Sequence, residues 1–255
     1  MKDFVQKLLA KTGYTVRRIG TLQGLPVGSS ARPIGVLEFF LEDLRARGFM
    51  PRGIIDVGAH RGDWTRLALS IFPGVPAILI EPQDEMDEPL GALIEATQNC
   101  RRIKAGAGRE PGELVQTIWE DYAGSSFLPP ADSALAAQGR QRRTPIVTLD
   151  QVLAEAGAPF EPDLVKLDIQ GFELEALAGG ESLFGRVEVF IIETSLIQFY
   201  PNNPTMDEVI AFMRQRDYVV YDLPGFGRRP SDGALGQVDV AFVKKNGRFR
   251  LSTQW

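Results

Sequence analysis

The sequence predicts a doubly wound α/β fold, in which a mostly parallel sheet is covered on both faces by helices. Short runs of Ile, Leu, Val and Phe alternate along the chain with segments of helical periodicity, the pattern of successive β–α units. Two late strands, at 218–221 and 238–243, are joined without a helix, so the last strand is expected to be antiparallel. With 255 residues, 44% of them hydrophobic, the chain can bury the core of one large domain.

The first strand, at 54–56, runs into a turn with two glycines at G-x-x-x-G spacing, Gly58 and Gly62. Gly58 has no Cβ and would let the backbone approach a ligand, while Gly62 would let the next helix begin against the strand. That helix is predicted by apolar residues at i, i+3, i+4 and i+7, namely Trp64, Leu67, Ala68 and Ile71.

The remaining elements follow from the same two periodicities. Further strands are expected at 77–81, 103–107, 164–168 and 187–193. The clearest helices are expected at 37–44, at 149–156 and 206–216 with capping boxes, and at 172–178 before two glycines. Residues 121–143 are expected to form a loop-like insertion that serves as a substrate lid.

Residues 1–50 are interpreted as a helical lead-in that packs on the core, and residues 51–255 as the main domain. The segment Met1–Thr15 alternates apolar residues with lysines, so it is too polar for a signal sequence or an integral membrane segment. It is expected to pack on the domain or on a second subunit, and a homodimer is therefore left open.

The net charge and the number of cysteines exclude several classes of function. A net charge of −5 argues against broad binding to nucleic acid. The single cysteine, Cys100, excludes an intrachain disulfide framework and a cysteine-based zinc site, and a cytoplasmic location fits it best. No metal is expected with only one histidine and one cysteine, although a magnesium site of Asp168, Glu193 and water is left open.

Four acidic residues stand at the ends of predicted strands: Asp56, Glu81, Asp168 and Glu193. Ligands of a parallel sheet bind beyond the carboxyl ends of its strands. Glu81 lies about two dozen residues beyond the glycine turn, where an acid in a nucleotide-binding unit accepts hydrogen bonds from ribose hydroxyls. Each acid alone is also compatible with a helix cap or a salt bridge.

The glycine turn lacks the G-x-G-x-x-G pattern of dinucleotide sites, because His60 holds the place of the glycine that makes room for a pyrophosphate. S-adenosylmethionine has no phosphate, so the turn together with Glu81 favours this cofactor. The chain also has no Tyr-x-x-x-Lys dyad to support hydride chemistry.

Two motifs resemble the FkbM-type methyltransferases of the class I S-adenosylmethionine-dependent superfamily. Asp56-Val57-Gly58-Ala59-His60-Arg61-Gly62 is similar to the family's D-V-G-A-N-x-G, and Val165-Lys166-Leu167-Asp168-Ile169-Gln170-Gly171-Phe172-Glu173 to its K-I-D-V-E-G-x-E. The resemblance covers about 53–243. It implies a Rossmann-like, seven-stranded sheet and transfer of a methyl group to an oxygen, often on a sugar or a polyketide-type product. His60 and Gln170 replace the usual asparagine and glutamate.

Residue roles follow from the reaction, an in-line displacement in which positioning supplies much of the catalysis. The catalytic candidates are Asp168, Glu193 and His60, each of which could hold the acceptor or remove its proton. The expected cofactor-binding residues are Asp56, Gly58, His60, Gly62, Glu81 and Asp168. The expected acceptor-binding residues are Gln170, Glu173, Ser125, Ser126 and Tyr200.

The sequence therefore predicts an O-methyltransferase that acts on a hydroxyl of a sugar, a glycan or a small metabolite. One alternative is a Rossmann-like oxidoreductase that retains NAD. Another is a scaffold that binds S-adenosylmethionine without turnover, which the two motif departures suggest. A Ser/His/Asp hydrolase is disfavoured because the chain has no G-x-S-x-G elbow.

Overall fold

The computed structural model describes residues 26, 27, 29, 32–252 and 254. The chain divides into two compact units, Met1–Pro33 and Ile34–Trp255. The second unit includes helix α2, Leu37–Ala46, which the sequence analysis grouped with the lead-in. The helix expected within Met1–Thr15 lies outside the described residues.

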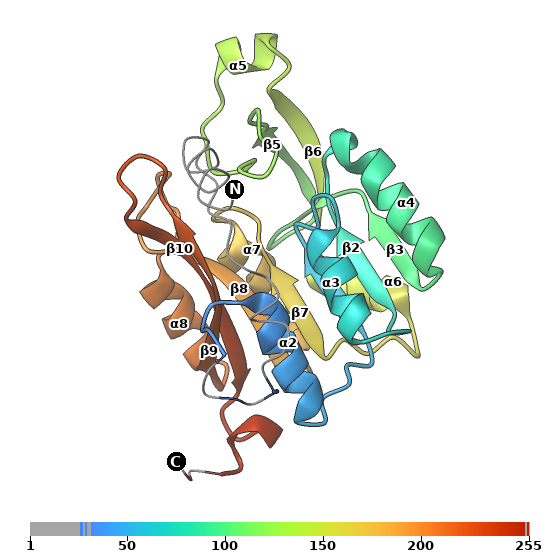
Figure 1. Ribbon diagram of the computed structural model, residues 1–255. Helices are drawn as coiled ribbons and strands as arrows, with labels where there is room; N and C mark the ends of the chain where they lie inside the picture. Colours follow the sequence, from blue (N-terminus) through green and yellow to red (C-terminus); the bar gives the residue numbers. More distant parts are fainter. Residues whose placement is uncertain (1–25, 28, 30–31, 253, 255) are drawn as a thin grey trace, which may run out of the picture. The chain divides into compact units, whose positions relative to one another are not determined.

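A seven-stranded sheet forms the centre of the larger unit, in the order β3-β2-β1-β7-β8-β10-β9 (Figure 1). Strand β10 is antiparallel to both of its neighbours, while β3, β2, β1, β7 and β8 are parallel. The predicted fold class is confirmed, and the last strand, β10, is inserted between β8 and β9. The strands are β1 Ile54–Val57, β2 Ala77–Ile80, β3 Cys100–Ile103, β7 Leu164–Leu167, β8 Val189–Ser195, β9 Tyr218–Arg228 and β10 Leu235–Lys244.

Helices cover both faces of this sheet because its strands are apolar on both sides. Alternate strand residues join two separate core clusters; Ile54 faces one and Ile55 the other. The first face packs against α2, α3 (Asp63–Ile71) and α4 (Asp87–Thr97). The second packs against α6 (Leu149–Ala156), α7 (Glu173–Ala178) and α8 (Met206–Arg214). Single 3₁₀ turns occur at Asp84–Met86, Glu181–Leu183 and Arg248–Arg250.

A second sheet of three strands was not predicted. Its order is β4-β6-β5, and Figure 1 shows β5 and β6 above one end of the large sheet. The strand expected at 103–107 is wrong as a single element, because the chain leaves β3 at Ile103 and enters β4 after Lys104 and Ala105. The strands are β4 Gly106–Ala107, β5 Gly112–Thr117 and β6 Gln141–Val147.

The insertion is also less loop-like than predicted. Helix α5, Ser133–Ala137, and strand β6 occupy much of its second half. Arg142 and Arg143 hid this strand from the sequence analysis, since a charged pair reads as a solvated face. Both lie in β6, opposite Gln116 and Val115 of β5. The irregular part of the insertion therefore lies between β5 and α5.

Most other boundaries agree with the predictions within two residues. The strands expected at 218–221 and 238–243 are longer than predicted, because the antiparallel pairing of β9 with β10 continues to Arg228 and Leu235. Strand β8 runs on to Ser195, so Glu193 lies inside a strand and not at its end. The extension follows from the pairing of β8 with β10, which continues to Ser195 and Gln237. Within the described part of the chain, no helix combines the length and the apolar character needed to cross a membrane.

The capping box of α6 offers a test of the local structure. The Thr148 hydroxyl accepts the Gln151 N–H, and the Gln151 side chain accepts the Thr148 N–H. Thr148→Ala is expected to lower the free energy of unfolding by about 1 kcal/mol, because an N–H of the first turn loses its partner. Urea unfolding measures this loss. Ser70→Ala, which removes an exposed hydroxyl at the end of α3, should change stability by less than about 0.5 kcal/mol; equal losses in both variants would contradict the cap's role.

Candidate functional site

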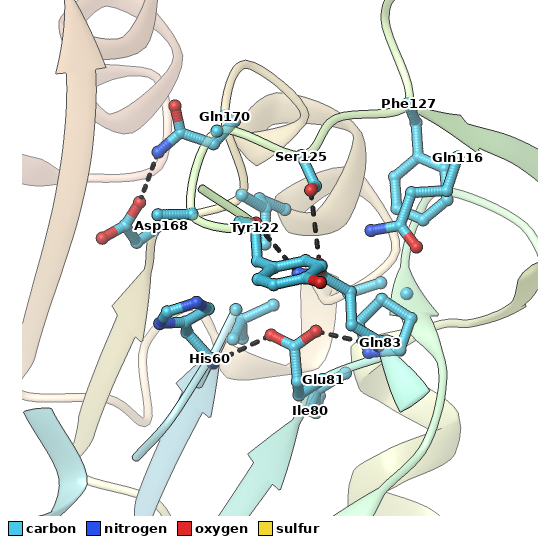
Figure 2. A pocket seen from close by; sticks show the side chains of 18 of the residues that line it. His60, Ile80, Glu81, Gln83, Gln116, Tyr122, Ser125, Phe127, Asp168 and Gln170 are labelled. Carbon is cyan, nitrogen blue, oxygen red and sulfur yellow. Dashed lines mark hydrogen bonds between the residues drawn. The ribbon is translucent and has the colours of Figure 1, made fainter. Parts of the chain in front are cut away.

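A pocket of about 400 Å³ lies beyond the carboxyl ends of β1, β2 and β7 (Figure 2). The chain passes from β1 outward to β2 and β3 and returns to β7 on the other side of β1, so this is the point where the strand order reverses. Parallel α/β sheets bind ligands at such a point. Of the four acidic residues predicted to face this edge, three line the pocket: Glu81, Asp168 and Glu193.

The Glu81 carboxylate is fixed at the end of β2 by two backbone N–H groups. One oxygen accepts the N–H of His60 at 2.8 Å, and the other accepts the N–H of Gln83 at 2.9 Å. The side chain is 3% exposed, and burial raises its pKa although both hydrogen bonds favour the ionised form. Each oxygen has one further lone pair, so the carboxylate can accept two more hydrogen bonds from a ligand in the pocket.

Gly58 lines the pocket, but its nearest close contact is with the protein itself. Its φ is +82°, and a Cβ at this position would lie 2.0 Å from the carbonyl oxygen of Asp168. Because Gly58 has no side chain, the turn after β1 can pack directly against the turn after β7. Gly62, also at φ +82°, does not line the pocket; a Cβ there would meet Leu93 of α4 at 2.6 Å.

His60 lines the pocket from the glycine turn. Its backbone is left-handed, with φ +47°. Histidine and asparagine are enriched in this conformation, which explains how one replaces the other in the motif. Among the described residues, nothing hydrogen-bonds the buried Nε2 atom, so this nitrogen is free for a ligand.

Lys166 and Asp168 form a buried ion pair at the end of β7. The Lys166 ammonium, 5% exposed, donates to Asp168 Oδ2 at 2.7 Å. Burial opposes the charge of Lys166, but the carboxyls of Asp168, Asp239 and Asp56 outweigh it and raise its pKa. Burial likewise opposes ionisation of Asp168, and the Lys166 ammonium outweighs it and lowers the Asp168 pKa. Asp168 is therefore ionised at neutral pH.

Glu193 has the opposite protonation state. Burial, followed by the neighbouring Asp168 charge, raises the pKa of Glu193 to about 10. Gln170 donates from one amide nitrogen to Asp168 Oδ1 and to Glu193 Oε2, both at 2.9 Å, and Gln237 donates to Glu193 Oε2 at 2.7 Å. The pocket thus holds an ionised and a protonated carboxyl side by side, the arrangement that separates base and acid roles.

Asp56 does not line the pocket. It is 1% exposed, and its Oδ2 accepts the Thr65 hydroxyl of α3 at 2.5 Å. Its Oδ1 has no partner among the described residues, and burial raises its pKa to about 6 against the opposing charge of Lys166. The geometry gives Asp56 a role in joining β1 to α3 and in balancing the Lys166 charge.

Three of the expected acceptor-binding residues lie outside the pocket lining: Glu173, Ser126 and Tyr200. Glu173 Oε1 accepts the N–H groups of Ile169 and Gly171, so it braces the turn after Asp168. Ser126 donates to the carbonyl oxygen of Gln170 at 2.8 Å. The Tyr200 hydroxyl accepts the indole N–H of Trp119 at 2.8 Å.

The loop after β5 closes over the pocket. The backbone carbonyl of Tyr122 accepts a hydrogen bond from Gln83 Nε2 at 3.1 Å, and the Ser125 hydroxyl donates to Gln83 Oε1 at 3.3 Å. Figure 2 shows the Tyr122 ring over the Glu81 carboxylate and Ser125 above it. With Ser126 bound to Gln170, the loop is attached to both ends of the pocket, and its role as a substrate lid stays a prediction.

A model of the methyltransferase FkbM domain matches residues 56–220, well over half of the chain. The chain belongs to the FkbM methyltransferase family. The match spans both sequence motifs, one in the glycine turn and one in the turn after β7. It favours methyl transfer over the NAD-dependent alternative. No curated protein sequence matches the chain.

Solved structures similar to this FkbM-family chain are methyltransferases of low sequence identity. An rRNA methylase from Streptococcus thermophilus is 12% identical, with a TM-score of 0.46 over 83% of this chain and 98% of its own. A 1,6-didemethyltoxoflavin-N1-methyltransferase from Burkholderia thailandensis, solved with bound 1,6-didemethyltoxoflavin and S-adenosylhomocysteine, is 14% identical, with a TM-score of 0.44 over 82% and 76% of the two chains.

S-adenosylmethionine is the cofactor that membership of this family implies, and the pocket fits it. Its volume of about 400 Å³ is within the usual range for small ligands. Glu81 offers two acceptor lone pairs to a ribose, and the unpartnered His60 Nε2 lies on the same wall. Within the described part of the chain, no cluster of three or more His, Cys, Asp or Glu residues could hold a metal ion.

Sequence reasoning missed several residues that build this site. Gln83 and Tyr122 lie at the Glu81 end of the pocket, and Lys166, Gln237 and Asp239 surround the paired carboxyls. Lys166 was visible in the K-x-D motif. Gln237 and Asp239 could have been found as well, because they are polar residues at alternate positions of the otherwise apolar last strand.

The buried Glu173 carboxyl predicts a pH-dependent stability. Burial raises its pKa to about 7, so the folded chain keeps a proton that the unfolded chain loses near pH 4. Folding stability therefore falls as pH rises between these values. Glu173→Gln keeps an acceptor for Ile169 and Gly171 and should gain on the order of 3 kcal/mol over wild type from pH 4 to 8, measured by urea unfolding.

Glu175 provides the matched control on the same helix. Its exposed carboxylate pairs with Arg109, which lowers its pKa. Glu175→Gln should therefore lose stability relative to wild type as pH rises, the opposite sign to Glu173→Gln. A flat pH dependence of the Glu173→Gln difference would contradict the assigned protonation of Glu173.

Proposed function

We propose that this chain transfers a methyl group from S-adenosylmethionine to a hydroxyl oxygen of a sugar, a glycan or a small metabolite. The observation that carries the proposal is the pair of carboxyls at one end of the pocket, ionised Asp168 beside protonated Glu193, with Glu81 fixed at the other end. A hydroxyl acceptor must lose a proton during the reaction, so it needs a basic group within hydrogen-bond reach.

The Glu81 end would hold the nucleoside of the cofactor. Glu81 would accept hydrogen bonds from the ribose hydroxyls, and the loop carrying Tyr122 would cover the base. His60 Nε2 would bind a polar group of the methionine moiety. Bound S-adenosylmethionine supplies a methyl group already activated by its sulfonium, so the protein needs no nucleophile of its own.

The Asp168 end would hold the acceptor. Asp168 would accept the hydroxyl proton as the oxygen gains its methyl group, while protonated Glu193 would donate a hydrogen bond that orients the acceptor. Gln170 and Gln237 fix both carboxyls through their amides. Because the pKa of Asp168 is low, positioning supplies more of the rate than proton transfer does in this proposal.

A scaffold that binds S-adenosylmethionine without turnover is the alternative that the two motif departures favour. It differs from the proposed enzyme in one outcome, retention of the cofactor without methylation of any hydroxyl acceptor. The cytoplasmic location and the homodimer stay predictions from the sequence.

Two isosteric variants test the proposed roles. Tritium transfer from methyl-labelled S-adenosylmethionine to a panel of hydroxylated compounds gives the rate. Asp168→Asn cannot take the proton and should lower kcat by about 10² to 10⁴. Glu193→Gln keeps a neutral hydrogen-bond donor and should stay within about tenfold of wild type at pH 7.

Affinity for S-adenosylhomocysteine and the melting temperature serve as controls for folding and cofactor binding. A larger loss of kcat in Glu193→Gln than in Asp168→Asn would contradict the assignment of base and donor. Binding of S-adenosylhomocysteine with no transfer to any hydroxylated compound would favour the scaffold.

A further inference from the structure

A second cavity, of about 340 Å³, adjoins the pocket on the side of β9 and β10. Glu193 and Gln237 line both cavities, so they form the boundary between the two. No cofactor role accounts for this space, since the nucleoside end of the first pocket lies at Glu81, away from the boundary. The other lining residues are Gly35, Leu37, Pro224, Gly225, Phe226, Gly227, Val238 and Asp239.

One wall of this second cavity is aromatic. Phe226 is 47% exposed, although its ring packs on the backbone of Gly35. A Cβ at Gly35 would lie 2.3 Å from the ring, so only glycine allows this contact. The ring is thus held in place from one side and leaves part of its surface open to a ligand.

The lining of this cavity also includes two carboxyl groups, those of Glu193 and Asp239. Among the lining residues there is no Lys, Arg or His. The Asp239 carboxyl lies over Gly225, where a Cβ would meet its Oδ2 at 2.1 Å, and no hydrogen bond to it is found among the described residues. Burial raises the pKa of Asp239, and that of Glu193 is about 10.

We propose that the methyl acceptor binds in this second cavity as a neutral, hydroxyl-bearing ring, with one face on Phe226 and its hydroxyls on Asp239 and Glu193. The assignment rests on the proposed methyl transfer. An aromatic surface beside a few polar groups suits a ligand that is apolar on its faces and polar at its edge. An acidic acceptor is disfavoured because the cavity offers carboxyls and no cation to meet its charge.

The boundary residues explain how such a ring would reach the methyl group. A hydroxyl at its edge would meet Glu193 and Gln237, which are hydrogen-bonded to each other at 2.7 Å and linked through Gln170 to Asp168. A hydroxyl that extends past this boundary would enter the first pocket, which Asp168, the proposed base, lines together with Glu193 and Gln237. The acceptor would enter beside β9 and the cofactor beside β2.

Gly227 allows this cavity to be filled without touching the cofactor end. A Cβ at Gly227 would meet Gln237 Cβ at 3.4 Å, an ordinary contact, and its φ is not in the left-handed region. Gly227→Leu therefore adds a side chain at a residue that lines the cavity, and its Cβ makes only an ordinary contact. Arg228→Leu adds the same side chain one residue along the strand, where it is exposed, and serves as the matched control.

The probes are methyl glycosides of glucose, galactose, mannose and rhamnose, with glucose 6-phosphate as the anionic comparison. Saturation-transfer NMR on protein loaded with S-adenosylhomocysteine measures their binding. Wild type and Arg228→Leu should bind at least one methyl glycoside more tightly than glucose 6-phosphate. Gly227→Leu, and Phe226→Ala as a second variant, should weaken that binding by about tenfold or more.

S-adenosylhomocysteine affinity separates failure of this inference from failure of the proposed function. It should be the same in all four proteins within about twofold. If the cofactor product binds but no glycoside does, if glucose 6-phosphate binds best, or if both cavity variants bind like wild type, the acceptor assignment is wrong. If S-adenosylhomocysteine does not bind to wild type, the proposed methyl transfer itself is wrong.

Discussion

The site depends on the buried ammonium of Lys166. Asp168 follows its own strand, Asp56 comes from β1 and Asp239 from β10, and all three raise its pKa. These carboxyls could not be buried together without one cation among them, because removing one member of a buried ion pair leaves the other charges uncompensated. Lys166 therefore fixes which carboxyls are ionised. It keeps Asp168 charged, while the neighbouring Glu193 holds its proton.

The two sequence motifs form one structural unit around this charge. The turn after β1 contacts the turn after β7 through Gly58 and the Asp168 carbonyl, a contact that any Cβ would prevent. His60 and Gln170 both have left-handed backbones, so each turn points a side chain at the pocket. The same contact brings Glu81 and the pair of carboxyls, Asp168 and Glu193, into one cavity, which neither motif could form alone.

The sequence predicts what depends on local spacing. Periodicity and capping boxes place the large sheet and its helices, and the acid after each strand places Glu81 and Asp168. Contacts between distant segments were not predicted. Gly58 lines the pocket as expected but also packs against the Asp168 carbonyl, and the expected cofactor residue Asp56 lies outside the pocket lining and accepts a hydrogen bond from Thr65. The β5–β6 sheet and the cavity beside β9 depend on pairing across the chain, which no local pattern encodes.

The most direct test of the account is calorimetric titration of S-adenosylhomocysteine and of NAD into wild type, Glu81→Gln and Glu88→Gln. S-adenosylhomocysteine alone is expected to bind, with its affinity weakened by roughly 10- to 100-fold in Glu81→Gln, since a hydrogen bond to a charged group is worth about 1.5–3 kcal/mol. Glu88→Gln, an exposed change on α4, should bind like wild type. Binding of NAD, or an unchanged affinity in Glu81→Gln, would contradict the assignment of this pocket.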